Sequence, residues 1–338
     1  MRVNSRSLAA AILVLMLALP NNARAEEGDG APAWMGYLPS VSTKTSGGRC
    51  FWGDELLYRD WRVQRNVLTG HCRLLDGDDR RQAWGDFETC RAALDDVKGK
   101  RKLPPMSGKA VILLHGLAGS RRSMADIGSY LAEHGDYLVL NVGYASTHGS
   151  TADHAAALEQ IVSNLDGVDE INFVAHSLGN IVLRHYLAGC GASDTDSDSK
   201  ASPRMGRIVM LAPPNHSAQL ASDWGEWRLV KWCFGPSCQE LGCGWTDLKC
   251  KLATPPCEFG IVAGGCGDDE GWCPKLPGDD DGILSVECTR LKGASDFVVV
   301  PALHPLVGDG DETLKYTLRF LQHGFFISQS ERRPIAAD

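Results

Sequence analysis

One serine in the sequence stands in a setting that favours nucleophilic chemistry. Ser177 follows an apolar run, residues 171–175, and precedes a segment with a helical apolar pattern, residues 178–187. Ala175 and Gly179 are small, as is required of a tight strand-turn-helix that projects a hydroxyl above the edge of a sheet. Such a pentapeptide is common by chance. The strand before it and the helix after it make Ser177 a candidate nucleophile.

A serine nucleophile needs a base to accept its proton and an acid to orient that base. His304 is the candidate base because it directly follows an apolar, strand-like run, whereas His323 falls on an expected surface helix. Three consecutive aspartates precede Gly282. Asp281 is the candidate acid, because the glycine after it permits a tight turn, and Asp280 is the reserve. A solvated acidic turn or a calcium site is the structural alternative for this cluster.

Two backbone N–H groups are needed to stabilise the oxyanion that such a serine would generate. One is expected at Leu178, directly after the serine. The other is expected in the loop after the first strand, where the sequence His115-Gly116-Leu117 lets the backbone approach; Leu117 is the candidate. His115 is interpreted as a structural residue of that loop, and His176 as a buried residue that points away from the serine.

The elements that must position these residues follow from an alternation of apolar runs and helical patterns. Expected strands cover residues 109–114, 137–142, 171–174, 207–211, 259–263 and 297–301, and expected helices cover 123–134, 151–164 and 314–325, besides the helix after Ser177. Continuously apolar strands are typical of parallel sheets covered on both faces. The pattern predicts an α/β fold with a doubly wound, mostly parallel sheet.

The N-terminus has the features of an export signal. A basic start, an apolar run over residues 8–19 and the sequence Ala23-Arg24-Ala25 predict a signal peptide, residues 1–25, cleaved after Ala25. The mature protein is therefore expected to be secreted or periplasmic. No later run has the roughly 18–20 apolar residues that a transmembrane helix needs.

The rest of the chain divides into two expected parts. Residues 26–105 are predicted to form a cysteine-containing N-terminal extension and a basic, proline-stopped linker. Residues 106–338 are predicted to form the α/β domain, with a Cys/Trp-rich insertion at about 224–273. Trp224, Trp227 and Val230 recur at helical spacing in the insertion and are interpreted as its small core; contact with a lipid surface is the alternative.

Charge and cysteine content narrow the classes of partner. The chain has 34 basic and 42 acidic residues, and removal of the signal peptide with its three arginines would bring the net charge from −8 to −11. This disfavours nucleic acids and anionic membranes. Twelve cysteines in an exported chain predict disulfides. Since the segment from Cys233 to Cys273 has no C-x-x-C pair and no histidine, a metal cluster is not expected.

Taken together, the motifs resemble α/β-hydrolases of the lipase and esterase kind. The resemblance covers about residues 106–325, and it is closest to small bacterial triacylglycerol lipases and to lipase-like proteins related to GPI inositol-deacylases. It rests on His115-Gly116, Ala175-His176-Ser177-Leu178-Gly179, Leu211-Ala212-Pro213-Pro214-Asn215, Asp281-Gly282 and His304.

The resemblance implies an α/β-hydrolase fold and a triad of Ser177, Asp281 and His304, with Leu117 and Leu178 as oxyanion donors and no metal or cofactor. The implied activity is hydrolysis of carboxylic esters, small-molecule or lipid, through an acyl-enzyme. An acyltransferase or thioesterase on the same residues, or a non-catalytic hydrolase-fold binding protein, is the alternative. The insertion and the N-terminal extension depart from the family pattern, so the substrate and the oligomeric state stay open.

Overall fold

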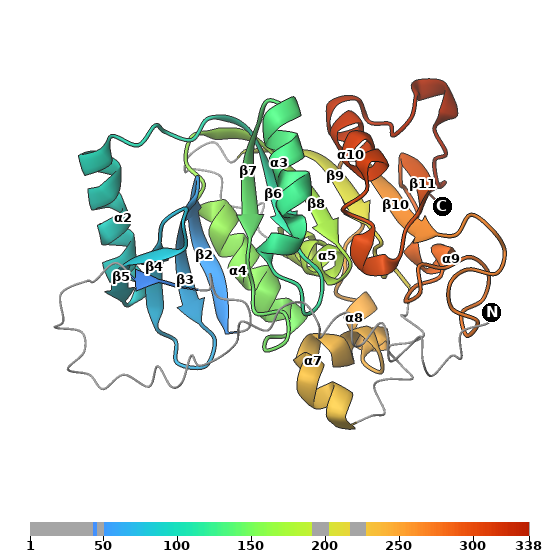
Figure 1. Ribbon diagram of the computed structural model, residues 1–338, viewed down its shortest axis with the longest axis horizontal. Coiled ribbons are helices and arrows are strands. Elements are labelled where there is room, and N and C mark those ends of the chain that lie inside the picture. The colour runs from blue at the N-terminus through green and yellow to red at the C-terminus, as the bar shows by residue number, and fades with distance from the viewer. Residues whose placement is uncertain (1–42, 46–50, 191–202, 217–227, 338) are drawn as a thin grey trace.

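The chain folds around two β-sheets, a small antiparallel one and a larger parallel one. The structure is a computed structural model that describes residues 43–45, 51–190, 203–216 and 228–337. Figure 1 shows the small sheet and its helix on the left and the larger sheet, with helices on both faces, at the centre and right. The predicted signal peptide and the tryptophans at positions 224 and 227 lie outside the described residues.

The N-terminal extension is a five-stranded antiparallel sheet in the order β1-β5-β4-β3-β2. Helix α2 packs against β4 and β5, and Asp86 caps its first turn by accepting a hydrogen bond from Thr89 N at 2.7 Å. The helix includes Lys98–Arg101, the first half of the basic, proline-stopped segment 98–105 that the sequence predicts to be a linker. The elements are β1 (Thr43–Lys44), β2 (Trp52–Tyr58), β3 (Trp61–Asn66), β4 (Cys72–Leu75), β5 (Arg80–Gly85) and α2 (Phe87–Arg101).

The larger sheet has six parallel strands in the order β11-β10-β9-β8-β6-β7. This confirms the predicted α/β architecture with a parallel sheet. Its strands are β6 (Gly108–Leu114), β7 (Tyr137–Val142), β8 (Val168–His176), β9 (Arg204–Leu211), β10 (Phe259–Gly265) and β11 (Asp296–Pro301). Strand β10 lies within the range 224–273, so the cysteine-rich stretch is divided between a segment before β10 and a loop after it.

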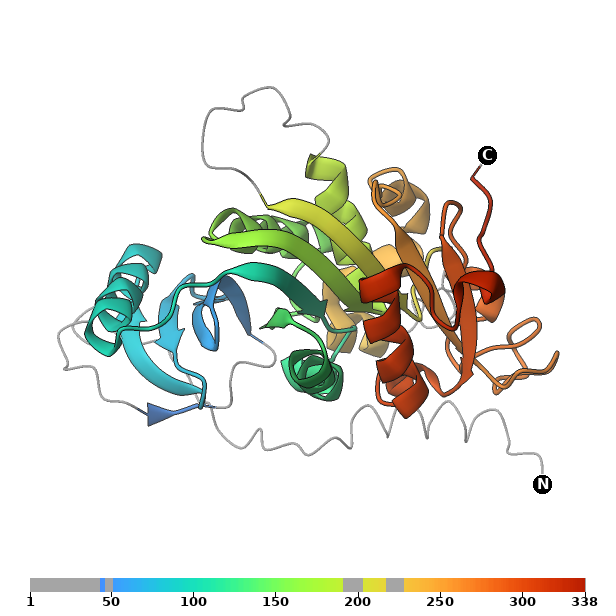
Figure 2. The same ribbon diagram turned by 90° about the horizontal axis from the view of Figure 1, so that it is seen from above.

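Helices cover both faces of the parallel sheet, as the turned view in Figure 2 shows. Helices α3 and α10 bury their apolar side chains with those of one face, and α4 and α5 do so on the other face. Burial on both faces explains why the strands have no alternation of polar and apolar residues. The helices are α3 (Ala125–His134), α4 (Thr151–Ser163), α5 (Leu178–Cys190) and α10 (Asp311–His323), with short helices η2 (Arg121–Met124), α9 (Val286–Thr289), η3 (His304–Leu306) and η4 (Gln329–Glu331).

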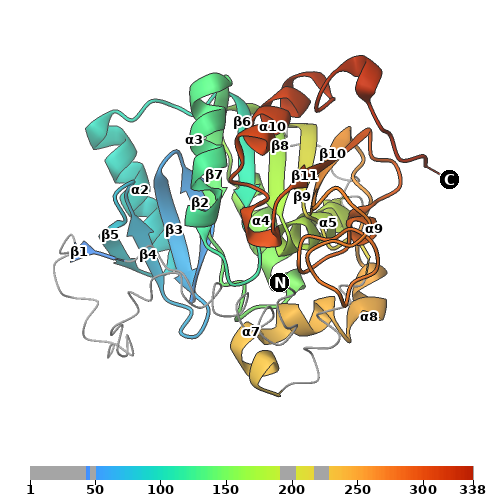
Figure 3. The ribbon, with the colours of Figure 1, turned by 45° about the vertical axis from the view of Figure 1, so that its right-hand side comes forward.

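The insertion before β10 contains α7 (Arg228–Leu241) and α8 (Trp245–Lys249). Figure 3 shows both below the sheet, beside the loop that joins β7 to α4. Ser237 Oγ donates to Gly149 O at 2.8 Å, and Thr151 N donates to the Glu240 carboxylate at 2.8 Å. Gly235 interrupts α7 with a positive φ, and a Cβ there would lie 1.9 Å from Thr147 O, so this position needs glycine.

The predicted disulfide-rich insertion is not shown. Within the described ranges, eight cysteines are free thiols: Cys72, Cys90, Cys238, Cys243, Cys250, Cys257, Cys266 and Cys273. The side chains of Cys50 and Cys233 lie outside the part of the chain that the structure describes. Among the described helices, none is both long and apolar enough to cross a bilayer.

Candidate active site

Ser177 lies at a sharp turn between β8 and α5. Its φ is +51°, a backbone conformation that costs energy in a non-glycine residue and is typical of functional turns. The turn is fixed by the hydrogen bond from Ser177 N to Leu211 O at 3.0 Å. A Cβ at Gly179 would lie 2.6 Å from Leu114 O and 2.9 Å from His115 O. The requirement for a small residue after the serine therefore comes from close contact with the end of β6.

His304 begins η3, the short helix after β11, and its ring lies between Ser177 and Asp281. Its Nε2 is 2.8 Å from Ser177 Oγ, and its Nδ1 is 2.7 Å from Asp281 Oδ2. Because a carboxylate only accepts, Nδ1 carries the proton and Nε2 has a lone pair for the serine hydroxyl. The side chains of His304 and Asp281 are 5% and 0% exposed, so the hydrogen bond between them is shielded from water. The structure thus brings together the three side chains that the sequence singled out.

Asp281 is held in place by the loop in which it lies. Its Oδ1 accepts hydrogen bonds from Ile283 N at 3.0 Å and Leu284 N at 2.7 Å, while its carbonyl accepts from His304 N at 2.8 Å. Those bonds leave Oδ2 directed at the histidine ring. A carboxylate fixed in this way needs no reorganisation when positive charge develops on the imidazole.

Asp280, the reserve candidate for the acid, is directed elsewhere. It is fully buried, and its carboxylate accepts from Cys273 N at 3.0 Å and Gly282 N at 2.6 Å. Burial raises the pKa of this carboxyl. Asp280 therefore braces the acid loop, and among the neighbouring aspartates it is Asp281 that contacts His304.

The loop after β6 passes close to the serine. A Cβ at Gly116 would lie 3.1 Å from Ser177 Cβ and 3.0 Å from His176 Nδ1, so any larger residue would crowd the serine and its neighbour. Leu117 follows Gly116, and its N–H donates no hydrogen bond to any residue of the described chain. Leu178 is the first residue of α5, where a helix leaves its N–H groups unsatisfied. Both candidate oxyanion donors therefore lie on segments adjacent to Ser177.

His115 and His176 are structural residues, as the sequence analysis interpreted them. His115 contacts Gly116 O through Nδ1 at 2.8 Å, and its Nε2 accepts from Tyr144 N at 3.3 Å. The Nε2 of His176 lies 2.9 Å from His304 O. Burial lowers the pKa of His176 to about 3, so this ring is neutral at pH values well above 3.

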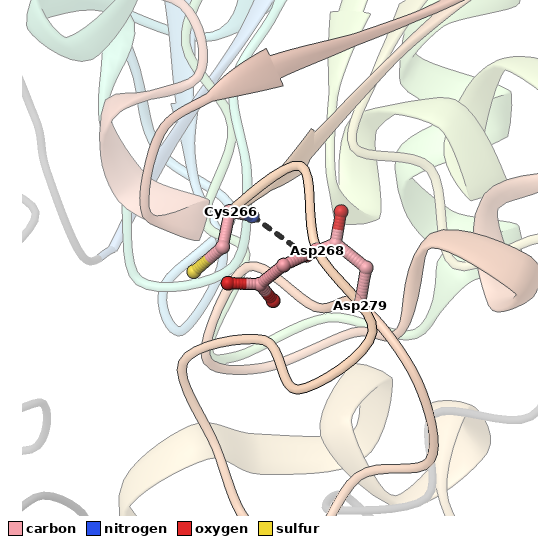
Figure 4. Close-up of side chains that lie close together, drawn as sticks. All are labelled: Cys266, Asp268 and Asp279. Atoms are coloured by element: carbon pink, nitrogen blue, oxygen red, sulfur yellow. Dashed lines mark hydrogen bonds between the residues drawn. The ribbon is translucent and has the colours of Figure 1, made fainter.

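One group of potential metal ligands lies beside the acid loop. Cys266 Sγ and carboxylate oxygens of Asp268 and Asp279 lie within 4.8 Å of one another, as Figure 4 shows. The sequence predicts no metal cluster in the segment from Cys233 to Cys273. Asp279 already accepts hydrogen bonds from Cys266 N at 2.6 Å and Gly267 N at 3.0 Å. These bonds account for the group as a turn that closes the loop leading to Asp281.

Sequence reasoning missed the residues that support the loop after β6. Ala118 N donates to Ser146 Oγ at 3.1 Å, and Tyr144 OH donates to His115 O. Asp54, from the N-terminal extension, is fully buried and accepts from Gly143 N at 2.7 Å. The available signal was an aspartate close to the apolar residues Trp52, Leu56 and Leu57, since a carboxylate is costly to bury without hydrogen-bond donors.

Comparison with known proteins identifies the fold. The family model described as alpha/beta hydrolase fold matches residues 109–230, a segment that includes the loop after β6 and Ser177. No curated protein matches the sequence. The chain resembles the α/β-hydrolase superfamily and has its fold, with a parallel sheet of six strands.

Solved structures with a similar backbone fold include bacterial lipases and esterases. A lipase of Bacillus licheniformis, BlEst2 in its propeptide form, is 17% identical, with a TM-score of 0.48 over 70% of this chain and 53% of that one. The product of gene lin2722 of Listeria innocua is 14% identical, with a TM-score of 0.45 over 69% of this chain and 99% of that one. A metagenomic carboxyl esterase, MGS0156, is 16% identical, with a TM-score of 0.41 over 59% of this chain and 65% of that one. The family model described as alpha/beta hydrolase fold supports a hydrolase.

Proposed function

We propose that this protein is an exported serine hydrolase that cleaves carboxylic esters through an acyl-enzyme. The observation that carries the proposal is the continuous hydrogen-bonded path from Ser177 Oγ through the ring of His304 to Asp281 Oδ2, with distances of 2.8 and 2.7 Å. A preformed path of this kind serves to remove the proton from a serine that attacks an electrophilic carbon.

In the first half of the reaction, Ser177 Oγ forms a bond to the ester carbonyl carbon while its proton passes to His304 Nε2. The carbonyl oxygen becomes an oxyanion and accepts hydrogen bonds from Leu117 N and Leu178 N. Collapse of this intermediate breaks the bond to the alkoxy oxygen, which takes the proton from His304 Nε2 and leaves as the alcohol. Throughout, Asp281 stays ionised and stabilises the imidazolium.

In the second half, His304 Nε2 takes a proton from water, and the water oxygen forms a bond to the acyl carbon. The second oxyanion uses the same two N–H groups. Its collapse breaks the bond to Ser177 Oγ, which recovers the proton from His304, and the carboxylic acid leaves. The reaction consumes one ester and one water and leaves the protein unchanged, so it needs no redox partner.

The ester is proposed to be a small-molecule or lipid ester. The feature that bears on its size is the insertion of α7 and α8, which docks on residues 147–151 at the end of the sheet where Ser177 lies. A series of p-nitrophenyl esters of increasing acyl length, measured below and above the micelle concentration, separates the classes. A jump in rate at the interface favours a lipase, and a smooth optimum at short chains favours an esterase.

The test of the reaction itself is the variant Ser177→Ala. We expect it to lose p-nitrophenyl ester turnover and covalent labelling by a fluorophosphonate probe, while an exposed serine on α4 replaced in the same way, Ser163→Ala, retains both. Labelling that persists in Ser177→Ala would overturn the assignment of the nucleophile. A wild-type protein that neither reacts with the probe nor hydrolyses any ester of the series would overturn the proposed function.

A further inference from the structure

The N-terminal extension contacts the parallel domain through a buried carboxylate. Asp54, on β2, accepts a hydrogen bond from Gly143 N at 2.7 Å through Oδ2, and its own N–H donates to Gly143 O at 2.8 Å. Gly143 directly follows β7. This pair of bonds attaches the antiparallel sheet to the segment that leaves the carboxyl end of β7, the same end of the sheet at which Ser177 lies.

The carboxylate is held from behind by two residues of the extension. Gln64 Nε2 donates to Asp54 Oδ1 at 2.7 Å, and Arg73 donates to Gln64 Oε1 through Nε and Nη2, both at 3.1 Å. All three side chains are buried. The arrangement fixes the direction of each hydrogen bond, since the carboxylate only accepts and the guanidinium only donates.

The segment after Gly143 carries the contact on to the loop that contains Leu117. Tyr144 N donates to His115 Nε2 at 3.3 Å, and the two rings stack with their centroids 4.2 Å apart. Two residues further on, Ser146 Oγ accepts from Ala118 N at 3.1 Å. The loop is therefore held on both sides of Leu117 by residues that closely follow Gly143, whose backbone Asp54 contacts.

We propose that Asp54 is a positioning residue for the oxyanion loop, residues 115–118. This inference rests on the proposed function, because it gives the extension a part in stabilising the oxyanion. A carboxylate is costly to bury and needs hydrogen-bond donors, whereas packing two sheets together requires only apolar side chains. The bond to Gly143 N instead fixes one backbone position, and through Tyr144 and Ser146 it sets the direction of the Leu117 N–H.

The structure offers a test by exchange of hydrogen-bond roles. In Asp54→Asn the amide cannot accept from both Gly143 N and Gln64 Nε2, so one bond is lost. In Asp54→Asn/Gln64→Glu the asparagine oxygen accepts from Gly143 N, its NH₂ donates to the carboxylate introduced at position 64, and Arg73 pairs with that carboxylate. Net charge is the same as in the wild type. Gln64→Glu alone places two carboxylates against each other and breaks the same link from the other side.

The first readout needs no catalysis. Amide hydrogen exchange at residues 115–118 and 143–146 is expected to be at least about tenfold faster in Asp54→Asn and in Gln64→Glu, and to return to the wild-type rate in the double variant. Glu55→Gln is the matched control, because Glu55 lies next to Asp54 on β2 and its carboxylate accepts from Arg65, not from Gly143 or Gln64. Unchanged exchange in the single variants would overturn the inference. This outcome does not depend on whether the protein hydrolyses esters.

The second readout is kinetic. We expect kcat for a p-nitrophenyl ester to fall about tenfold in Asp54→Asn with KM nearly unchanged, because an oxyanion contact acts in the transition state, and to recover to within about threefold in the double variant. Fast exchange with an unchanged kcat would overturn the role in the reaction. If Asp54→Asn does not fold, the comparison of Gln64→Glu with the double variant gives the same decision. Absence of fluorophosphonate labelling in the wild type is a failure of the proposed function, not of the positioning.

Discussion

The carbonyl oxygen of His304 lies 2.9 Å from Nε2 of His176. The residue that precedes the candidate nucleophile therefore holds the main chain of the candidate base. Since a carbonyl only accepts, the His176 Nε2 carries the proton and donates. Burial lowers the pKa of His176 to about 3, which keeps the ring in this neutral form at neutral pH.

This contact predicts that His176→Phe lowers kcat about tenfold, a loss typical of a displaced rather than a deleted catalytic group. The ring volume is similar, but the bond that fixes His304 is gone. Steady-state kinetics on a p-nitrophenyl ester measure the effect. His185 is a half-buried residue of α5, and His185→Phe is the control that we expect to keep the wild-type rate. An unchanged kcat in His176→Phe contradicts a role for this bond.

Substitution of Asp281 is expected to lower the activity far more than substitution of its neighbour Asp280. Asp281→Asn removes the acceptor that holds the proton on His304 Nδ1, so kcat/KM should fall by about 10³–10⁴. Asp280→Asn keeps that acceptor and disturbs only the bonds to Cys273 N and Gly282 N. It should lower the unfolding temperature and leave kcat/KM within about tenfold of the wild type. Equal losses of activity in the two variants would count against Asp281 as the acid.

Two glycines of α5 allow a matched test of the turn at Ser177. A Cβ at Gly179 meets Leu114 O at 2.6 Å, whereas a Cβ at Gly189 meets nothing within 4 Å. Gly179→Ala should destabilise the protein by about 1–3 kcal/mol through overpacking and lose most of its activity. Gly189→Ala should keep the activity and gain up to about 1 kcal/mol from helix propensity. Urea denaturation and ester turnover give both quantities, and a fully active Gly179→Ala would refute the steric argument.

Much of the parallel sheet could be predicted from the sequence because its strands are continuously apolar and its helices are periodic. The elements around Ser177 and His304 were therefore found to within a few residues. The antiparallel extension could not be predicted in this way. Strand β2 is buried at five of its seven positions, including Asp54, so it lacks the alternation that identifies a half-buried strand. Its carboxylate makes sense only beside Gly143, which is far away in sequence.

Contacts between residues far apart in the sequence also limited what could be predicted of the site. The candidate serine, acid and histidine are marked by local motifs, since each needs a glycine turn or a strand end next to it. Tyr144 and Ser146 have no such mark, because they act through contacts with His115 and Ala118 that only the folded sheet creates. Residues that position a loop from another strand are for this reason invisible to motif reasoning.

Acid sensitivity should come in part from His154. Burial lowers its pKa from an ordinary value of 6.5 to about 4, and its ring packs 4.8 Å from that of Tyr144. Between these values the unfolded chain binds the proton and the folded chain does not, so stability is lost as the pH falls below 6.5, by up to about 1.4 kcal/mol per pH unit. Urea denaturation at several pH values measures the slope. His154→Phe should flatten it, and His134→Phe, on the exposed end of α3, should not; an unchanged slope in His154→Phe contradicts the assignment.

The thiols of the extension provide the last test. Cys72 and Cys90 are fully buried, and burial raises their pKa values to about 11 and about 12, so both are protonated and inert toward alkylation. Cys243 and Cys250 are exposed. Mass spectrometry after iodoacetamide treatment should find the exposed pair modified in the native protein, and the buried pair modified only after unfolding, without added reductant. If Cys72 and Cys90 resist alkylation in the unfolded chain until reductant is added, they form a disulfide, and the free-thiol assignment is wrong.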